Sequence, residues 1–357
     1  MRLERKSLEA KVRKAATKAM GALPDTATEK LAGEPHEVDG YTLDPRLRLA
    51  MKAARLNTSV DAADPIALRR SSKESFALSN APRVPGVNVS ETIIADPSHG
   101  DLPARVYTPA HTPDGPRPAV LFLHQGGLVL GDTDTCDTFC TQMAAGLDAI
   151  VVSLDYRLAP EHHFPTQNDN VDAAWDWLVD SAPHLWIDPE QLVVCGDSAG
   201  GQLAASLCQR LRDADRPSPA VQVLIYPLVD GTASGGSMES CADEWPLSRD
   251  LMKAFGTHLD NSTVDSSDPA FSPALHPNLS GLPAAIVITA AFDILRDQGR
   301  RYARQLSYAS VPVIERCETE MCHSFVSMGA LSPAAYEASE RIVADIATML
   351  SERHLRA

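Results

Sequence analysis

From about residue 87 onward, the chain alternates between short apolar runs rich in β-branched residues and longer stretches with helical periodicity. This alternation predicts a parallel sheet with helices on its faces, because parallel strands need a crossover that is usually a helix. Strands are expected over 87–95, 104–107, 119–123, 149–154, 192–195, 221–226, 286–289 and 311–315. Helices are expected over 171–179, 199–211, 295–308 and 333–350. The fold class is therefore expected to be α/β, with a mostly parallel central sheet.

Two regions depart from this alternation. The first is residues 1–85, where short helical segments, including 44–56, are separated by prolines and no strand is evident. The second is about 228–283, a Gly-, Ser-, Asp- and Pro-rich stretch with one helical segment at 249–259. This stretch is expected to be an insertion above the sheet. Residues 86–357 would then form the main domain.

The first twenty residues carry seven basic residues and two acidic ones, with a narrow apolar stripe of helical period. We interpret them as a helix on the body of the protein, in preference to a membrane-surface segment or a transit peptide. A secretory signal would need a continuous apolar run of about 7 to 15 residues, which the segment does not have.

Composition excludes several classes of protein. The chain has 357 residues, of which 44% are hydrophobic and 22% charged, as in an ordinary globular protein. Its net charge of −15 disfavours nucleic-acid binding, because phosphate would be repelled. No uncharged apolar stretch approaches the roughly 18 residues of a membrane span. The expected partner is a small molecule, with neither nucleic acid nor membrane span.

The seven cysteines include no C-x-x-C pair, and an odd number cannot all be paired within the chain. This usage suits a reducing cytoplasm better than a secreted disulfide framework, so a cytoplasmic location is expected. Cys136 with Cys140 and Cys317 with Cys322 are close in sequence, but we interpret both pairs as small buried thiols. No metal site is expected.

The motif with the clearest chemistry is Gly196-Asp197-Ser198-Ala199-Gly200, which matches G-x-S-x-G between a predicted strand and a predicted helix. A serine on such a sharp turn has a strained backbone, and its hydroxyl is presented above the sheet. Ser198 is the candidate nucleophile.

A second motif, His124-Gln125-Gly126-Gly127, directly follows the predicted strand at 119–123. Backbone N–H groups of such a loop can stabilise the negative charge that develops on a carbonyl oxygen during acyl transfer. The candidate donors are Gly126, Gly127 and Ala199. We interpret His124 as a residue that fixes the geometry of this loop, not as a base.

A serine nucleophile needs a base held in the right tautomer by a carboxylate. On a turn of this kind the acid and then the base follow the serine in the chain. Asp293 follows the predicted strand at 286–289, and His323 lies between the last predicted strand and the last helix. These are the candidate acid and base. Asp297 is the competing acid, although its place one turn into a helix favours a capping or salt-bridge role.

Together with these motifs, three further segments resemble the hormone-sensitive-lipase-type esterases of the α/β-hydrolase fold, also called bacterial family IV. They are Asp155-Tyr156-Arg157-Leu158-Ala159-Pro160-Glu161, Phe292-Asp293-Ile294-Leu295-Arg296-Asp297 and His323-Ser324-Phe325. The resemblance implies that residues 1–85 form a helical cap over the site. It also implies hydrolysis of short- or medium-chain esters without metal or organic cofactor, and it brings in a homodimer as an option.

The chain departs from the family pattern around both loops. Gln125 stands where the first loop glycine is usual, and Leu128 where an aromatic residue is common. Glu320 and Ser324 flank His323 where glycines are frequent. The donor glycines are retained, so the sequence assigns no catalytic role to the Gln125 side chain. Differently shaped loops and a different pocket are expected.

The function expected from these residues is that of a serine carboxylesterase acting on a small ester substrate. An amidase or an acyltransferase could use the same triad, and sequence alone does not separate them. A third alternative is a non-catalytic ligand receptor on the same scaffold, like the plant gibberellin receptors, which lack the catalytic histidine. The presence of His323 argues against that alternative.

Overall fold

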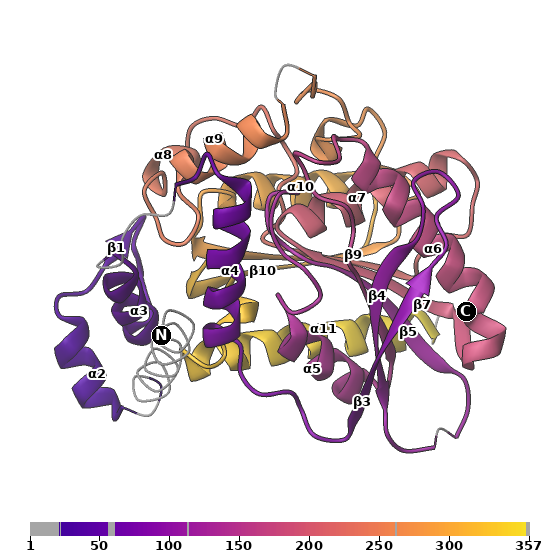
Figure 1. The fold of residues 1–357 in the computed structure, drawn as a ribbon, viewed down its shortest axis with the longest axis horizontal. Helices are drawn as coiled ribbons and strands as arrows, with labels where there is room; N and C mark the ends of the chain where they lie inside the picture. Colours follow the sequence, from indigo (N-terminus) through magenta and orange to yellow (C-terminus); the bar gives the residue numbers. More distant parts are fainter. Residues whose placement is uncertain (1–20, 22, 56–60, 113, 261–262, 355–357) are drawn as a thin grey trace, which may run out of the picture.

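The computed structural model describes residues 21, 23–55, 61–112, 114–260 and 263–354 (Figure 1). The strands of the main sheet are β3 (Val87–Ile94), β4 (Leu102–Pro109), β5 (Arg117–Leu123), β6 (Ile150–Leu154), β7 (Ile187–Asp197), β8 (Val221–Ile225), β9 (Ala284–Phe292) and β10 (Val313–Cys322). Their order across the sheet is β10-β9-β8-β7-β5-β6-β4-β3. Within this sheet, as the described residues form it, β4 pairs antiparallel with β3 and β6, and the other pairings are parallel. The predicted class, α/β with a mostly parallel sheet, is confirmed.

Helices cover both faces of the sheet (Figure 1). On one face lie α5 (Asp137–Leu147) and α11 (Pro333–His354), and on the other α6 (Thr166–Leu185), α7 (Ala199–Asp213) and α10 (Arg296–Tyr308). The strand β5 shows why two layers form. Leu121 and Leu123 pack into the core on the α7 side, whereas Val120 and Phe122 pack into the core on the α11 side. Alternate residues of a strand point to opposite faces, so both faces of an apolar strand must be covered.

The N-terminal region holds α2 (Asp25–Ala32), α3 (Pro45–Arg55) and α4 (Pro65–Ser79). The helix predicted at 44–56 agrees with α3. The expectation that this region has no strand is wrong, because β1 (Glu37–Val38) and β2 (Tyr41–Thr42) pair antiparallel. Strands of two residues are too short to show a periodicity in sequence. The helix predicted in the first twenty residues lies outside the described residues.

The insertion contains α8 (Ser237–Ser240) and α9 (Arg249–His258), and the latter agrees with the helix predicted at 249–259. In Figure 1, α4 and α8–α9 lie on the same side of the molecule, next to the ends of the parallel strands. Arg69 fastens α4 to the main domain through an ion pair with Glu161, at 2.6 Å, and a hydrogen bond to the Val129 carbonyl, at 2.8 Å. The division into a cap segment at 1–85 and a main domain at 86–357 stays a prediction.

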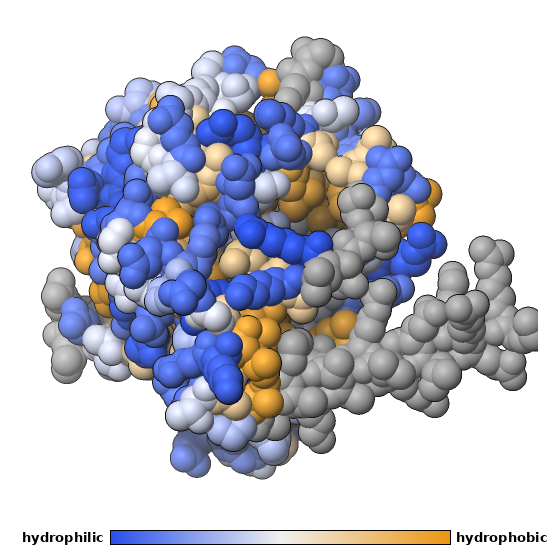
Figure 2. All heavy atoms as spheres, turned by 90° about the vertical axis from the view of Figure 1, so that its left-hand side faces the viewer, coloured by the Kyte–Doolittle hydropathy of each residue, from blue (hydrophilic) through white to orange (hydrophobic). Residues whose placement is uncertain are grey.

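The molecular surface is mostly polar on the side that carries α2 and α3, where hydrophobic residues form separate patches (Figure 2). Exposed large hydrophobic side chains in the described part of the chain are Leu31, Ile66, Ile93, Trp186, Leu275 and Tyr308. Scattered hydrophobic residues of this kind are normal on globular proteins. Among the described residues, no helix combines the length and the apolar character needed to cross a membrane.

Candidate active site

Ser198 occupies the turn between β7, which ends at Asp197, and α7, which begins at Ala199. Its backbone has φ 56° and ψ −117°, a conformation that is costly for any residue with a side chain. Two backbone contacts hold the turn. The Ser198 N–H donates to the Ile225 carbonyl at 2.8 Å, and the Ser198 carbonyl accepts from Leu228 N–H at 3.2 Å. The hydroxyl is thereby fixed at the edge of the sheet.

The turn can close only because two neighbouring residues lack side chains. A Cβ atom at Gly200 would lie 1.9 Å from the carbonyl oxygen of Leu123, and one at Gly196 would lie 2.1 Å from the carbonyl oxygen of Gly200. Both distances are far below van der Waals contact. The two glycines of the G-x-S-x-G motif are therefore steric requirements of this turn.

The structure brings the three predicted site residues together. Each directly follows the last residue of a parallel strand: Ser198 follows β7, Asp293 follows β9 and His323 follows β10. The carboxyl ends of these strands meet at one edge of the sheet. There His323 Nε2 lies 2.9 Å from Ser198 Oγ, and His323 Nδ1 lies 2.7 Å from Asp293 Oδ2. The three groups form one continuous chain of hydrogen bonds.

Burial and a backbone contact fix the orientation of Asp293, the acid of this hydrogen-bonded series. Asp293 is fully buried, and its Oδ1 accepts a hydrogen bond from Leu295 N–H at 2.8 Å. With one carboxylate oxygen held by the backbone, the other is directed at His323 Nδ1. That contact requires the proton of a neutral imidazole to reside on Nδ1, so Nε2 is free to accept the proton of the Ser198 hydroxyl.

Asp297, the competing acid, is engaged elsewhere. Its Oδ2 accepts a hydrogen bond from Ser237 N–H at 2.9 Å, and its Oδ1 pairs with Arg296 Nε at 2.8 Å. Burial alone would raise the pKa of Asp297, but its bonds to Arg296 and Ser237 hold this pKa below the ordinary value. Asp297 makes no hydrogen bond to His323 in the described structure.

The glycine-rich loop after β5 lies beside Ser198, since β5 and β7 are neighbours in the sheet. Gly126 and Gly127 line the cavity that contains Ser198 and His323. Gly126 has φ 131°, which residues with side chains do not adopt. Ala199 is the first residue of α7, where an N–H group has no partner within the helix. All three candidate donors are thus close to the nucleophile.

His124 is buried at the start of this loop. Its Nδ1–H donates to the Gln125 carbonyl at 2.8 Å, and its ring stacks on Tyr156 with the two centroids 4.2 Å apart. Burial lowers the pKa of His124 to about 4, against the opposing effect of that hydrogen bond. These contacts agree with a role in shaping the loop.

The buried His124 predicts a loss of stability in acid. The unfolded chain binds a proton near the ordinary pKa of 6.5, whereas the folded protein binds it only near 4. Stability is therefore complete above about pH 6.5 and declines as the pH falls toward 4, by about 3 kcal/mol from this residue. In urea titrations over this range, His124→Asn should show a correspondingly shallower decline of the unfolding free energy. Parallel curves for the two proteins would contradict the assignment.

Two cavities meet at Ser198. One, of about 180 Å³, lies between α4 and α9 and is bordered by Gln125, His323, Trp245 and Leu251. The other, of about 290 Å³, is bordered by Ala199, Leu228, Met252, Val264 and Phe271. Trp245, which borders the first of these, belongs to the insertion at 228–283. A molecule bound across Ser198 can extend in two directions.

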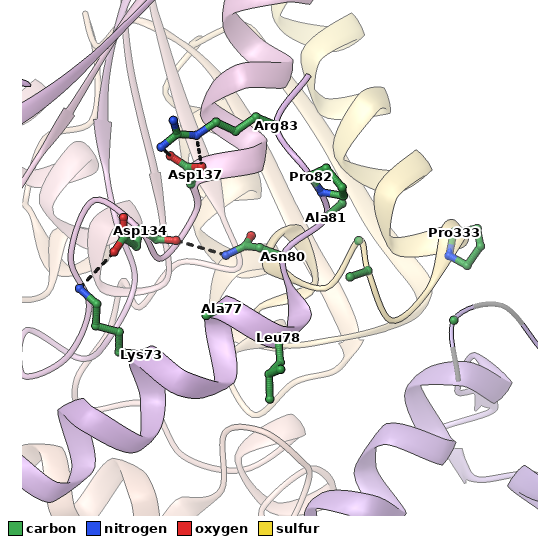
Figure 3. Close-up of a pocket in the computed structure, with 13 residues that line it drawn as sticks. Lys73, Ala77, Leu78, Asn80, Ala81, Pro82, Arg83, Asp134, Asp137 and Pro333 are labelled. Atoms are coloured by element: carbon green, nitrogen blue, oxygen red, sulfur yellow. Dashed lines mark hydrogen bonds and ion pairs between the residues drawn. The ribbon is translucent and has the colours of Figure 1, made fainter. Parts of the chain in front are cut away.

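A larger cavity, of about 770 Å³, lies away from this site, between the C-terminal end of α4 and the start of α11 (Figure 3). Its charged side chains are already paired. Lys73 contacts Asp134 at 3.1 Å, and Arg83 contacts Asp137 at 2.6 Å. Neither nucleophile nor base borders it. Size alone therefore does not identify the reactive site, and the smaller cavities around Ser198 do.

Sequence reasoning missed the residue packed against the base. The ring of Tyr226 lies 4.7 Å from the ring of His323, and its hydroxyl donates to Asp197 at 2.9 Å. Burial raises the pKa of Asp197 to about 7, although the Tyr226 hydrogen bond opposes this. Tyr226 directly follows β8, as the site residues follow their strands. That position is the one signal in the sequence that could have found it.

Arg157 and Glu161, in a segment that carries the family resemblance, contact different partners. Arg157 lies 3.6 Å from Asp96 and donates to the His99 carbonyl at 2.6 Å, whereas Glu161 pairs with Arg69 of α4. Both contacts are structural. Cys136, Cys140 and Cys322 are buried as expected, but Cys317 is partly exposed. In the described ranges, no group of three or more His, Cys, Asp or Glu side chains is arranged to hold a metal ion.

Comparison with known proteins agrees with this geometry. The family described as the alpha/beta hydrolase fold matches residues 120–327, which include Ser198, Asp293 and His323. This chain belongs to the α/β-hydrolase family. The resemblance to hormone-sensitive-lipase-type esterases is confirmed by curated relatives of this α/β hydrolase. The carboxylic ester hydrolase LipN of Mycobacterium tuberculosis is 36% identical over 90% of this chain and 86% of LipN. The ethyl acetate hydrolase of Pseudomonas putida is 34% identical over 77% of this chain and 87% of its own length.

Solved structures give the same result for the fold of this α/β hydrolase. The ester-hydrolase EH1AB1 from the metagenome of Lake Arreo superposes with a TM-score of 0.81 and 32% identity, covering 86% of this chain and 98% of that one. An esterase of Pyrobaculum calidifontis superposes with a TM-score of 0.78 and 34% identity, covering 86% and 99% of the two chains.

Proposed function

We propose that this α/β hydrolase is a serine carboxylesterase that hydrolyses short- to medium-chain carboxylic esters through an acyl-enzyme. The observation that carries the proposal is the hydrogen-bonded chain from Ser198 through His323 to Asp293, beside three backbone N–H groups. Relatives whose names describe carboxylic ester hydrolysis support the same reaction.

In the first half of the reaction, His323 Nε2 takes the proton of the Ser198 hydroxyl as Oγ attacks the ester carbonyl carbon. The carbonyl oxygen gains negative charge, which the N–H groups of Gly126, Gly127 and Ala199 stabilise. Asp293 stabilises the imidazolium that forms. His323 then gives its proton to the oxygen of the departing alcohol, and the C–O bond to that alcohol breaks.

In the second half, water replaces the alcohol. His323 takes a proton from the water as its oxygen attacks the acyl carbon, and then returns a proton to Ser198 Oγ as the acid leaves. The two halves together consume one ester and one water and release one alcohol and one acid.

The two cavities suggest where the two parts of the ester bind. His323 must reach the departing alcohol oxygen, so the alcohol part belongs in the cavity of about 180 Å³ that His323 borders. The acyl chain then extends into the other cavity, of about 290 Å³. The proposed acyl cavity lies at the lower end of the roughly 300 to 1000 Å³ of sites for drug-sized ligands, which supports short to medium acyl chains.

The direct experiment is a rate profile on p-nitrophenyl esters of increasing acyl length, with the matching p-nitroanilide and an added acceptor alcohol. We expect ester hydrolysis with a maximum at short or medium length. Faster cleavage of the anilide, or transfer to the alcohol in preference to water, would replace the proposal with an amidase or an acyltransferase. Binding without turnover would indicate a receptor. A cytoplasmic location and a homodimer stay predictions.

One pair of variants tests the assignment of the two cavities. Val264→Phe fills the proposed acyl cavity and should lower kcat/KM for the longest accepted acyl chain roughly tenfold or more, while acetyl esters are little affected. Leu251→Phe is the matched control in the other cavity, and it should discriminate against bulky alcohols instead. The reverse pattern in steady-state kinetics would exchange the two assignments.

A further inference from the structure

The side chain of Gln125 joins the two loops that the reaction uses. Its Oε1 accepts a hydrogen bond from the Ser324 hydroxyl, and its Nε2 donates to Ser327 Oγ at 3.0 Å. Gln125 immediately precedes the candidate donor Gly126, and Ser324 immediately follows His323. We call residues 124–127, which carry the candidate N–H donors Gly126 and Gly127, the oxyanion loop. One amide group therefore connects the oxyanion loop to the loop that carries His323.

The directions of these hydrogen bonds are fixed by the neighbouring groups. Ser327 Oγ lies 3.0 Å from the Thr135 carbonyl, which can only accept, so the Ser327 proton points there. Ser327 Oγ must then accept from Gln125 Nε2. This orients the amide with Oε1 toward Ser324, whose hydroxyl donates to it. The Gln125 amide and the Ser327 hydroxyl therefore each donate one hydrogen bond and accept one, while Ser324 only donates and the Thr135 carbonyl only accepts.

Burial makes this connection costly to break. Gln125 is 2% exposed, Ser324 6% and Ser327 0%. A buried polar group without its hydrogen bond destabilises the conformation that leaves it unpaired. The loop that holds Gln125 is thus bonded to the loop that carries the base.

The backbone of Ser324 indicates that its hydroxyl has a specific use. Ser324 has φ 66° and ψ 15°, in the left-handed region that favours glycine. A serine at this position carries a conformational cost that glycine would not. The hydrogen bond between Gln125 and Ser324 is called the bridge below. Both of its residues depart from the family pattern, in which glycines are frequent at the two positions. The two substitutions meet in space and bond to each other.

We propose that Gln125 is a positioning residue, whose side chain holds the oxyanion donors and His323 at a fixed separation through Ser324 and Ser327. The inference rests on the proposed function. The ester must be attacked at its carbonyl carbon while its oxygen faces the N–H groups and its leaving oxygen faces His323. Both loops therefore have to be correctly placed relative to each other when the ester is attacked. A misplacement of a reacting group by about 1 Å can lower the rate a hundredfold. Gln125 touches neither reacting atom and acts through the loops.

The test compares Gln125→Met, which keeps the length of the side chain without its hydrogen bonds, with Gln142→Met. Gln142 is also buried, but its amide has no hydrogen-bond partner in the described structure, so it is a matched control. Rates are measured on a p-nitrophenyl ester. Each rate is divided by the concentration of competent sites, which are the Ser198 hydroxyls that react with a phosphonate. We expect Gln125→Met to lower kcat per competent site about ten- to a hundredfold, with KM nearly unchanged. Gln142→Met should leave both values unchanged.

Ser324→Gly is a second variant, which removes the hydroxyl and also the conformational cost of the left-handed backbone at this position. It should lower kcat per competent site in the same way without loss of thermal stability. If Gln125→Met does not fold, this variant alone tests the inference. The double variant should be little slower than Gln125→Met alone, because both changes remove one connection. Fully additive effects, or a kcat for Gln125→Met within twofold of Gln142→Met, would overturn the inference.

The failure of this inference differs from failure of the proposed function. Substantial hydrolysis by Ser198→Ala, measured in the same assay, would overturn the proposed function and the bridge with it. If hydrolysis depends on Ser198 but kcat per competent site is unchanged by Gln125→Met and Ser324→Gly, only the inference about the bridge would be overturned.

Discussion

Ser198→Ala is expected to lower kcat by about a millionfold while the protein stays folded. The hydroxyl is the one group placed to attack, at 2.9 Å from His323 Nε2 and at the meeting point of the two cavities. Without it, no acyl-enzyme can form, and only the oxyanion donors and substrate binding contribute to the rate. Alanine is also compatible with the turn in size. Initial rates on a p-nitrophenyl ester at high enzyme concentration measure the effect.

A matched control for this variant is Ser206→Ala. Ser206 is a buried serine on the same helix, and its hydroxyl donates to the Ala270 carbonyl at 3.0 Å, away from the nucleophile. Its removal should change kcat by a few-fold at most. Activity of Ser198→Ala within a hundredfold of the unsubstituted protein would contradict the nucleophile assignment.

Asp293→Asn is expected to lower kcat by about ten thousandfold. An asparagine at this position can present its NH₂ group to His323 Nδ1, which would then accept a hydrogen bond and place the ring proton on Nε2. The imidazole could no longer take the proton of the Ser198 hydroxyl. The side chain is almost isosteric, and its contact with Leu295 N–H can persist, so folding should be retained. The measurement is kcat at a pH where the unsubstituted protein is fully active.

Asp297→Asn is the control that the chain itself offers, four residues away in the same segment. Its carboxylate contacts Ser237 and Arg296 and not the base, so its effect on kcat should be much smaller. The opposite ranking of the two variants would move the acid of the triad to Asp297.

The site could be predicted from sequence where its chemistry is encoded locally. Ser198 and Gly126 belong to short motifs with fixed neighbours, and Asp293 and His323 follow apolar runs that predict strands. Parallel strands bring their carboxyl ends together, so the positions after them indicate a common site before any contact is known. This is why Ser198, Asp293 and His323 could be expected to lie close together although they are far apart in the chain.

Contacts made across the fold could not be predicted in this way. The bond between Gln125 and Ser324 joins positions about two hundred residues apart, and each residue looked in sequence like a departure from a glycine pattern. Tyr226 looked like one more buried strand residue. The contact between Gln125 and Ser324 has no local signal, because packing between loops decides it. The position of Tyr226 after β8 was hidden because the predicted strand extended to residue 226.

Two of the elements that were missed or shortened have a different reason. The helix α5 was not predicted because all of its residues from Thr138 to Ala144 are buried, so it has no exposed polar face to reveal a helical period. The strand β10 was expected to end at residue 315 but continues to Cys322. Its charged residues, such as Arg316 and Glu318, pair with each other and with Asp345 and Arg341, and they hide the strand pattern.

The most direct test of the central claim, that Ser198 is the nucleophile of an acyl-transfer site, is covalent labelling with a p-nitrophenyl phosphonate. Intact-mass spectrometry should show one phosphonyl group per chain together with loss of esterase activity, and peptide mapping should place it on Ser198. Ser198→Ala should gain no mass under the same conditions. A label on any other residue, or loss of activity without a label, would contradict the account.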